Sequence, residues 1–237
     1  MAYTTINKSS DYFNTNLYTG NNTETSHTVG FQPDFTWLKV RNADGSQYWF
    51  DAVRGATNYM RSDNTAVEGT LAETLKSFDA NGYTVGTSNA VNTNTETMVG
   101  WNWKAGTGQG SSNTDGSINT TYTSVNTTAG FSISSYTGTG SNATVGHGLG
   151  AKPDLMIVKN LGATENWMVY HKGLDTSAPE DHYILLNSNA AKVNEATVWN
   201  DTAPTSSVFS IGTHAATNQS GNAHIAYCFT EKTGYSK

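Results

Sequence analysis

The chain contains little of several residue types, and each shortage excludes a class of protein. Its 237 residues include one cysteine, so no intrachain disulfide can form and a disulfide scaffold is excluded. The 13 lysines and arginines form no run, which disfavours nucleic acid as a partner because phosphate neutralisation needs clustered cations. A net charge of −6 makes the protein a poor ligand for anionic membranes.

Long apolar segments are also missing. No run approaches the roughly 20 apolar residues that a membrane-spanning helix requires. Residues 1–13, MAYTTINKSSDYF, have neither the basic start nor the apolar centre of a signal peptide. We therefore expect a protein that is made in the cytoplasm and is not inserted into a membrane.

Charged residues make up only 14% of the chain, and serine, threonine, asparagine and glycine take their place. This composition can indicate disorder, but six Trp, twelve Tyr and eight Phe argue against it, because disordered segments are poor in aromatic residues. The composition is typical of a β-rich protein whose surface carries hydroxyl and amide groups.

An internal repeat organises the sequence. Residues 13–39 read FNTNLYTGNNTETSHTVGFQPDFTWLK, and residues 131–159 read FSISSYTGTGSNATVGHGLGAKPDLMIVK. Both run from Phe through Tyr-Thr-Gly, Thr-Val-Gly and Pro-Asp to a Lys six residues after the proline. The correspondence continues to the alternating segments 98–103 and 224–229, which close the two copies. Such self-similarity indicates two homologous modules.

We predict an all-β protein with two homologous β-sandwich modules of jelly-roll or lectin-like type, since short strands and Gly-marked turns recur throughout. The predicted organisation is an N-terminal β module at 1–104, a Gly/Ser/Thr-rich linker with a possible strand at 105–130, and a C-terminal β module at 131–237. Equivalent positions should superpose, and these are Pro33 with Pro153, Lys39 with Lys159, and Trp101 with Tyr227.

One short helix is expected, at residues 69–78. Leu71, Leu75 and Phe78 recur there at i, i+4 and i+7, with Thr70 as an N-cap. The second module has no clear equivalent of this segment.

No catalytic constellation is visible in the sequence. The six histidines have no HxH or HExxH spacing, and no GxSxG motif occurs. We therefore predict no catalytic residue, no metal site and no cofactor, and we expect that the protein is not an enzyme.

The six tryptophans fall into two groups by their neighbours. Those on strands in apolar company are expected in the core, and they are Trp37, Trp101 and Trp103. Those beside loops and polar residues are Trp49, Trp167 and Trp199. A ring of the second group could either stack on a sugar or lie half-buried under a loop.

The candidate glycan-binding residues are Trp199, Asn200 and Asp201. They place an aromatic face, an amide and a carboxylate next to one another, and the first module lacks this set. Loops on a rigid β scaffold are common binding sites.

Several blocks of this sequence resemble a known family. They are AYTTINKSSDYFNTNLYTGN, GFQPDFTWLKVRN, NTTAGFSISSYTGTGSNATVGHGLGAKPDLMIVKN and the final GYSK. They resemble a family of repeat-containing proteins of marine bacteriophages, of the kind that infect cyanobacteria and pelagic ocean bacteria. The resemblance covers nearly the whole chain and implies a virion or tail-fibre-associated structural protein.

The resemblance and the residues together predict a non-enzymatic virion surface protein, either a tail appendage or a head decoration. It would act through contacts with other virion proteins and with copies of itself. The alternative is a carbohydrate-binding module that recognises host surface glycans.

Overall fold

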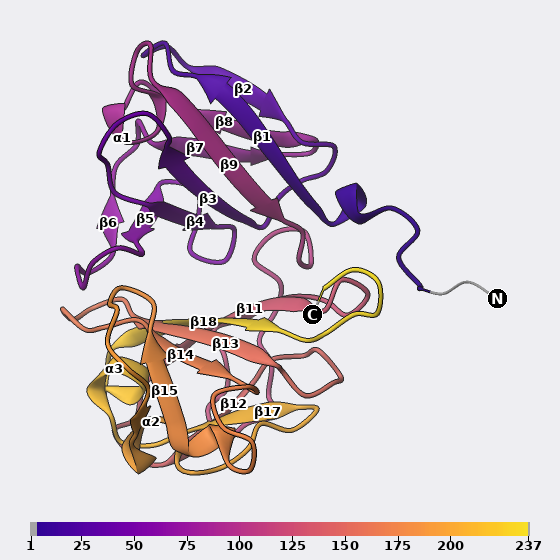
Figure 1. The fold of residues 1–237 in the computed structure, drawn as a ribbon, viewed down its shortest axis with the longest axis vertical. Coiled ribbons are helices and arrows are strands. Elements are labelled where there is room, and N and C mark those ends of the chain that lie inside the picture. The colour runs from indigo at the N-terminus through magenta and orange to yellow at the C-terminus, as the bar shows by residue number, and fades with distance from the viewer. Residues whose placement is uncertain (1–3, 237) are drawn as a thin grey trace.

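The protein is described by a computed structural model over residues 4–236. The chain is all-β, with two sandwich modules stacked along the long axis of the molecule (Figure 1). All strand pairs within its sheets are antiparallel. The predicted fold class is therefore confirmed.

The first module consists of two sheets. The larger has the strand order β1 (Phe13–Thr19), β9 (Thr97–Trp103), β3 (Phe35–Val40), β4 (Tyr48–Asp51), β5 (Asn58–Arg61) and β6 (Gly69–Thr70). The smaller has the order β2 (Thr25–Thr28), β8 (Gly82–Val85) and β7 (Leu75–Asp79). A 3-10 helix at Ser9–Asp11 precedes β1, and α1 (Asn89–Asn92) precedes β9.

The second module follows the same plan. Its larger sheet has the order β10 (Tyr122–Asn126), β11 (Phe131–Thr137), β18 (Ala223–Phe229), β13 (Leu155–Asn160), β14 (Met168–His171), β15 (His182–Leu185) and β16 (Val193–Asn194). Its smaller sheet contains β12 (Ala143–Gly146) and β17 (Val208–Ile211). A 3-10 helix at Pro179–Asp181 and the helices α2 (Ala196–Trp199) and α3 (Ala215–Asn218) complete it.

Strand registers confirm the repeat. Phe35 of β3 lies opposite Trp103 of β9, and Leu155 of β13 lies opposite Phe229 of β18. The expected equivalences therefore hold, with Lys39 on Lys159, Trp101 on Tyr227, and Pro33 on Pro153 two residues before β3 and β13.

The aspartate of each Pro-Asp pair holds the chain that leaves its module. The carboxylate of Asp34 is buried and accepts backbone N–H bonds from Ala105 (2.7 Å), Thr107 (3.0 Å) and Gly108 (2.6 Å). Asp154 likewise accepts one from Glu231 at 2.6 Å. Burial raises the pKa of Asp34, although the three N–H bonds oppose this shift. The repeated motif thus secures the segment after the last strand.

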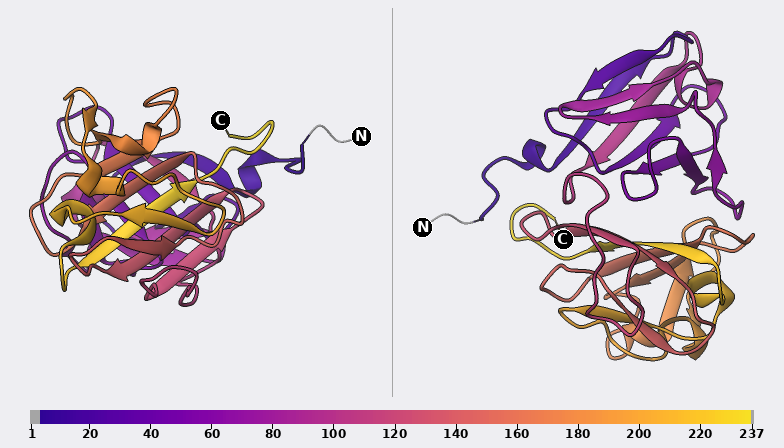
Figure 2. Two further views of the ribbon diagram at one scale, coloured as in Figure 1. Left: turned by 90° about the horizontal axis from the view of Figure 1, so that it is seen from below. Right: turned by 180° about the vertical axis from the view of Figure 1, so that it is seen from behind.

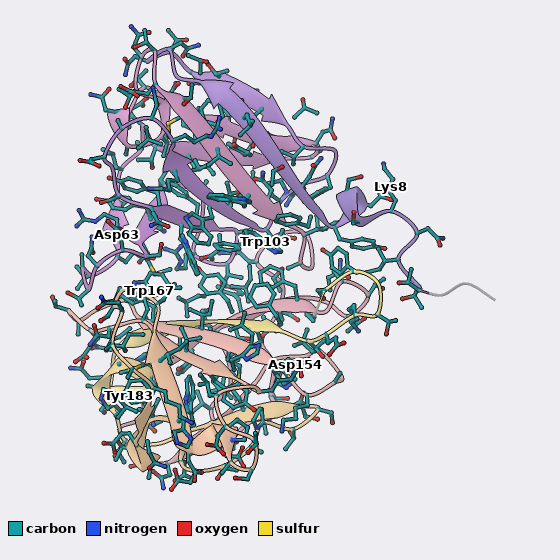
Figure 3. The ribbon with its side chains drawn as sticks, viewed as in Figure 1. Lys8, Asp63, Trp103, Asp154, Trp167 and Tyr183 are labelled. Carbon is teal, nitrogen blue, oxygen red and sulfur yellow. The ribbon has the colours of Figure 1, made fainter. Side chains whose placement is uncertain are left out.

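The two larger sheets pack against each other through aromatic side chains, and we call this contact the seam (Figure 3). The ring centroids of Trp49 and Trp167 lie 4.8 Å apart, and those of Phe35 and Tyr227 lie 4.9 Å apart. Phe131 adds a further ring, 6.1 Å from Phe35. Because successive side chains of a strand point to opposite faces, each larger sheet serves both its own sandwich core and the seam.

A buried ionic cluster crosses the seam beside these rings. The guanidinium of Arg54 donates to Asp51 (2.5 Å) and Glu68 (2.8 Å), and the hydroxyl of Tyr227 donates to the same Asp51 carboxylate at 2.6 Å. Burial, together with the Asp51 charge, raises the pKa of Tyr227 well above its ordinary value. The hydroxyl therefore stays protonated and joins the two modules by a charge-assisted hydrogen bond.

The helix predicted at residues 69–78 is wrong. This segment forms β6 and β7, and β7 pairs with β8 across a two-residue turn at 80–81. Leu75 is buried while Leu71 is exposed, so the helical spacing of the leucines is coincidental. The α-helices of the described chain are α1, α2 and α3. Among residues 4–236, no helix is both long and apolar enough to cross a membrane.

The segment at 105–130 contains the possible strand that the sequence suggested. Residues 122–126 form β10, which pairs with β11, and Ile118 forms an isolated bridge to Val145. Residues 122–126 therefore lie on the larger sheet of the second module, and Ile118 lies beside β12 of the smaller sheet.

The burial of the tryptophans in the structure is largely the reverse of what the sequence predicts. Trp49 and Trp167, beside loops in the sequence, are fully buried because each is covered by the opposite module. The three expected in the core, Trp37, Trp101 and Trp103, are partly exposed, and only Trp37 and Trp103 of these pack against the seam cluster.

We predict that Trp49→Ala lowers the free energy of unfolding by about 3–5 kcal/mol, the usual cost of truncating a fully buried large aromatic side chain. Trp101→Ala is the matched control, because Trp101 lies partly exposed on the same sheet outside the seam cluster, and it should cost clearly less. Urea denaturation of both variants provides the measurement. Equal losses would show that the seam does not stabilise the protein.

Candidate functional site

The structure does not support Trp199, Asn200 and Asp201 as a sugar platform. Trp199 ends α2 and is only 1% exposed, within the core of the second module, where its ring lies 6.3 Å from that of Tyr170. Asn200 and Asp201 form the turn after the helix, with φ values of 57° and 42°. The side-chain oxygen of Asn200 accepts a hydrogen bond from Asn142. These residues terminate a helix, and no face of the indole is open to a ligand.

A different polar and aromatic arrangement lies at one margin of the seam. It is an open groove of about 450 Å³, which we call the seam groove. Its lining comes from both modules and consists of Trp37, Gln47, Ser62, Asp63, Leu186, Asn187, Ser188 and Asn189. Asp63 and Trp167 are labelled on the facing margins of the two modules in Figure 3.

Trp37 supplies the aromatic surface of the seam groove. It lies on β3 and is packed on two sides, against Trp49 (centroids 5.3 Å apart) and Trp101 (5.1 Å). Its side chain is partly exposed, so part of the ring remains open to solvent. An aromatic ring held by two others is a rigid platform that loses little conformational entropy on binding.

Asp63 supplies a carboxylate on the loop that follows β5. The indole N–H of Trp167 donates to the carbonyl oxygens of Arg61 and Asn64, both at 3.1 Å. One Asp63 oxygen also accepts the backbone N–H of Gln47 at 3.3 Å. The second module therefore fixes the loop that brings Asp63 into the groove.

Lys159 of the second module also holds the loop after β5. Its ammonium group is buried and has four carbonyl oxygens within hydrogen-bonding distance for its three N–H donors, those of Asn160 and Glu165 (both 2.9 Å), Thr65 (3.3 Å) and Ala163 (3.4 Å). Burial lowers the pKa of Lys159 to about 8, although the charge of Glu165 opposes this shift. A charged lysine thus occupies a carbonyl cage at the seam and ties Thr65 of the first module to the second.

The opposite wall of the groove is the loop after β15. The side-chain oxygen of Asn187 accepts the backbone N–H of Trp167 at 3.0 Å, and its amide nitrogen donates to Asn166 at 2.9 Å. Ser188 accepts the N–H of Ala190 and can still donate its hydroxyl proton. This wall presents amide and hydroxyl groups toward Trp37 and Asp63.

The seam groove is formed by equivalent parts of the repeat. Segments 59–64 and 183–188 correspond in the two copies, and the structure brings the ends of both to one place. The correspondence was visible in the sequence, but their meeting depends on how the modules pack. For this reason, the sequence did not single out Asp63 or Asn187.

Chemically, the groove combines an aromatic face with one carboxylate and several amide and hydroxyl groups. Such a combination suits a neutral, hydroxyl-rich ligand, since the ring packs against its C–H groups and the polar groups bind its hydroxyls. Within the described chain, no three His, Cys, Asp or Glu side chains are grouped so as to hold a metal ion.

Fold and groove together define a class of all-β protein built from two homologous sandwich modules joined by an aromatic seam. Residues 8–237 match the family described as a domain of unknown function, DUF7483, and the chain belongs to this family. No curated protein matches the chain, and no solved structure matches it either.

We predict that the stability of the wild type relative to Lys159→Met rises with pH above about 8. Lys159 has a folded-state pKa near 8 and an ordinary value of 10.5, so the unfolded chain binds more protons between these values. Stability therefore increases with pH across this window as the buried charge is lost. Urea denaturation of both proteins at several pH values gives the difference between their free energies of unfolding. If this difference stays constant or falls as the pH rises above about 8, Lys159 is not buried as a charged group.

Proposed function

We propose that this protein is a non-enzymatic structural protein of a phage virion surface, either a tail appendage, a fibre-associated protein or a head decoration. It acts through contacts with other virion proteins. The resemblance of its repeated motifs to marine phage proteins supports this proposal, and the seam is the observation of the structure that carries it.

The seam favours a rigid building block. Interfaces between domains of one chain are usually rather polar and permit relative motion. Here the contact consists of packed aromatic rings and a buried ionic cluster, centred on Trp49, Trp167, Tyr227 and Arg54. Opening it would expose the rings and would separate the Tyr227 hydroxyl from the buried Asp51 carboxylate, which would lose a charge-assisted hydrogen bond. A fixed relation between two similar modules suits a load-carrying or spacing role.

Mass spectrometry of purified phage particles tests this proposal. We expect the protein in repeated copies per particle, at a constant ratio to the major capsid protein after gradient purification. Its presence only in the soluble fraction of the lysate, with none in the particles, would refute a virion location.

Recognition of a host surface glycan is the second candidate, and the seam groove favours it. Trp37 supplies an aromatic platform, and Asp63, Asn187 and Ser188 supply hydrogen-bonding groups on two facing walls. One such site would bind in the millimolar range, about −4 kcal/mol, so attachment would need many copies acting together.

We predict that Trp37→Ala and Asp63→Asn each weaken glycan binding by about tenfold or more, equal to at least about 1.4 kcal/mol. Both remove a group that lines the groove. Asp201→Asn, at the exposed turn after α2, is the matched control and should bind as the parent does. A glycan array followed by calorimetric titration measures this. Unchanged binding in both groove variants, or no binding by the parent, would exclude this second function.

A further inference from the structure

The two modules differ at one edge of their larger sheets. In the second module, β10 lies outside β11 and pairs with it from Tyr122 opposite Ser135 to Asn126 opposite Phe131. In the first module, the equivalent strand β1 pairs only with β9, so its outer edge carries no strand of the described chain. Within residues 4–236, the seven-residue strand Phe13–Thr19 is therefore paired along one edge only.

The sequence contains a counterpart of β10 for the first module. Residues 3–7 read YTTIN, and residues 122–126 read YTSVN. The first segment lies just before β1, and the second lies just before β11. The repeat therefore extends further toward the N-terminus than the strands of the first module do.

A glycine turn explains why only the second copy folds back on its own module. Gly130 precedes β11 with φ of 71°, and its N–H donates to the carbonyl oxygen of Asn126 at 2.8 Å. A side chain at Gly130 would meet the backbone oxygen of Thr230 at 2.6 Å, so this tight return requires glycine. Tyr12 stands at the corresponding place before β1, with φ of −128°.

The segment before β1 takes another path. It passes through the 3-10 helix Ser9–Asp11 and runs away from β1, as the indigo chain shows in Figures 1 and 2. No residue between 3 and 13 is a glycine. The first copy therefore lacks the glycine turn that, in the second copy, places β10 on β11.

The uncovered edge exposes apolar surface. Leu17 of β1 is 64% exposed, the highest value among the large hydrophobic residues that are exposed in the described chain. Its counterpart Ser135 is partly covered and lies opposite Tyr122 of β10. In the equivalent register, residue 3, a tyrosine, would stand opposite Leu17, and such an aromatic–aliphatic cross-strand pair is favourable.

We propose that residues 3–7 of one copy add as an antiparallel strand to the free edge of β1 of a second copy, with Thr5 opposite Thr15. The register is that of β10 on β11, transferred through the repeat. Backbone hydrogen bonds provide most of the affinity in this mode of recognition, and an open edge strand is a template for it. The contact joins copies head to tail and does not depend on where the protein is located.

Cysteine cross-linking tests the contact directly. Thr5→Cys and Thr15→Cys are introduced into separate, differently tagged chains that are expressed together and mildly oxidised. Both positions are exposed, and the native Cys228 is buried. We expect a disulfide-linked heterodimer carrying both tags. The pair Thr5→Cys with Ser220→Cys is the control, since Ser220 is also exposed but lies in the second module, and it should give none.

Two further results decide the matter. A chain carrying both Thr5→Cys and Thr15→Cys should form oligomers linked through disulfides. If it forms an internal disulfide in a monomer instead, the segment covers its own β1 and the proposal is wrong. Removal of residues 1–7 should shift the protein from oligomer to monomer in sedimentation equilibrium. Undiminished association of this truncated chain, or absence of the heterodimer, would also overturn the proposal.

Discussion

Packing of aromatic rings between the two larger sheets is the interaction on which the rest of the structure depends. Trp49 contacts both Trp167 and Tyr227 there, and the Asp51–Arg54 ion pair is buried beside them. Each larger sheet is therefore covered on both faces, which gives four layers of strands and one continuous body. The seam groove exists only because this packing brings the loops after β5 and β15 together.

The modules share one framework and differ at its edges. Register, the Pro-Asp contact and the strand order are common to both, because they form the sandwich and the seam. The differences lie outside these. The second module has α2 between β16 and β17, where the first module has β7 between β6 and β8, and β10 covers the edge of β11 while the equivalent edge of β1 carries no strand of the described residues. The outer edge of β1 is thus a point at which the two copies differ, while the shared parts maintain the fold.

Much of the fold could be predicted from the sequence, because the repeat fixes equivalent strands and their register. Lys39 and Lys159 illustrate both the success and its limit. They are equivalent in register, yet only Lys159 is buried in a carbonyl cage, since Thr65 of the other module completes it. The burial of Trp49 and the position of Asp63 have the same origin. Contacts between modules produce no hydrophobic periodicity in the sequence of either copy. The candidate site therefore could not be located from the sequence.

Differential scanning calorimetry of the whole chain tests the central claim, that the seam makes the two modules one cooperative unit. The account predicts a single transition in which the calorimetric enthalpy equals the van't Hoff enthalpy, as expected when no intermediate is populated. Two resolved transitions, or a calorimetric enthalpy about twice the van't Hoff value, would show that the modules unfold independently. That result would contradict the account.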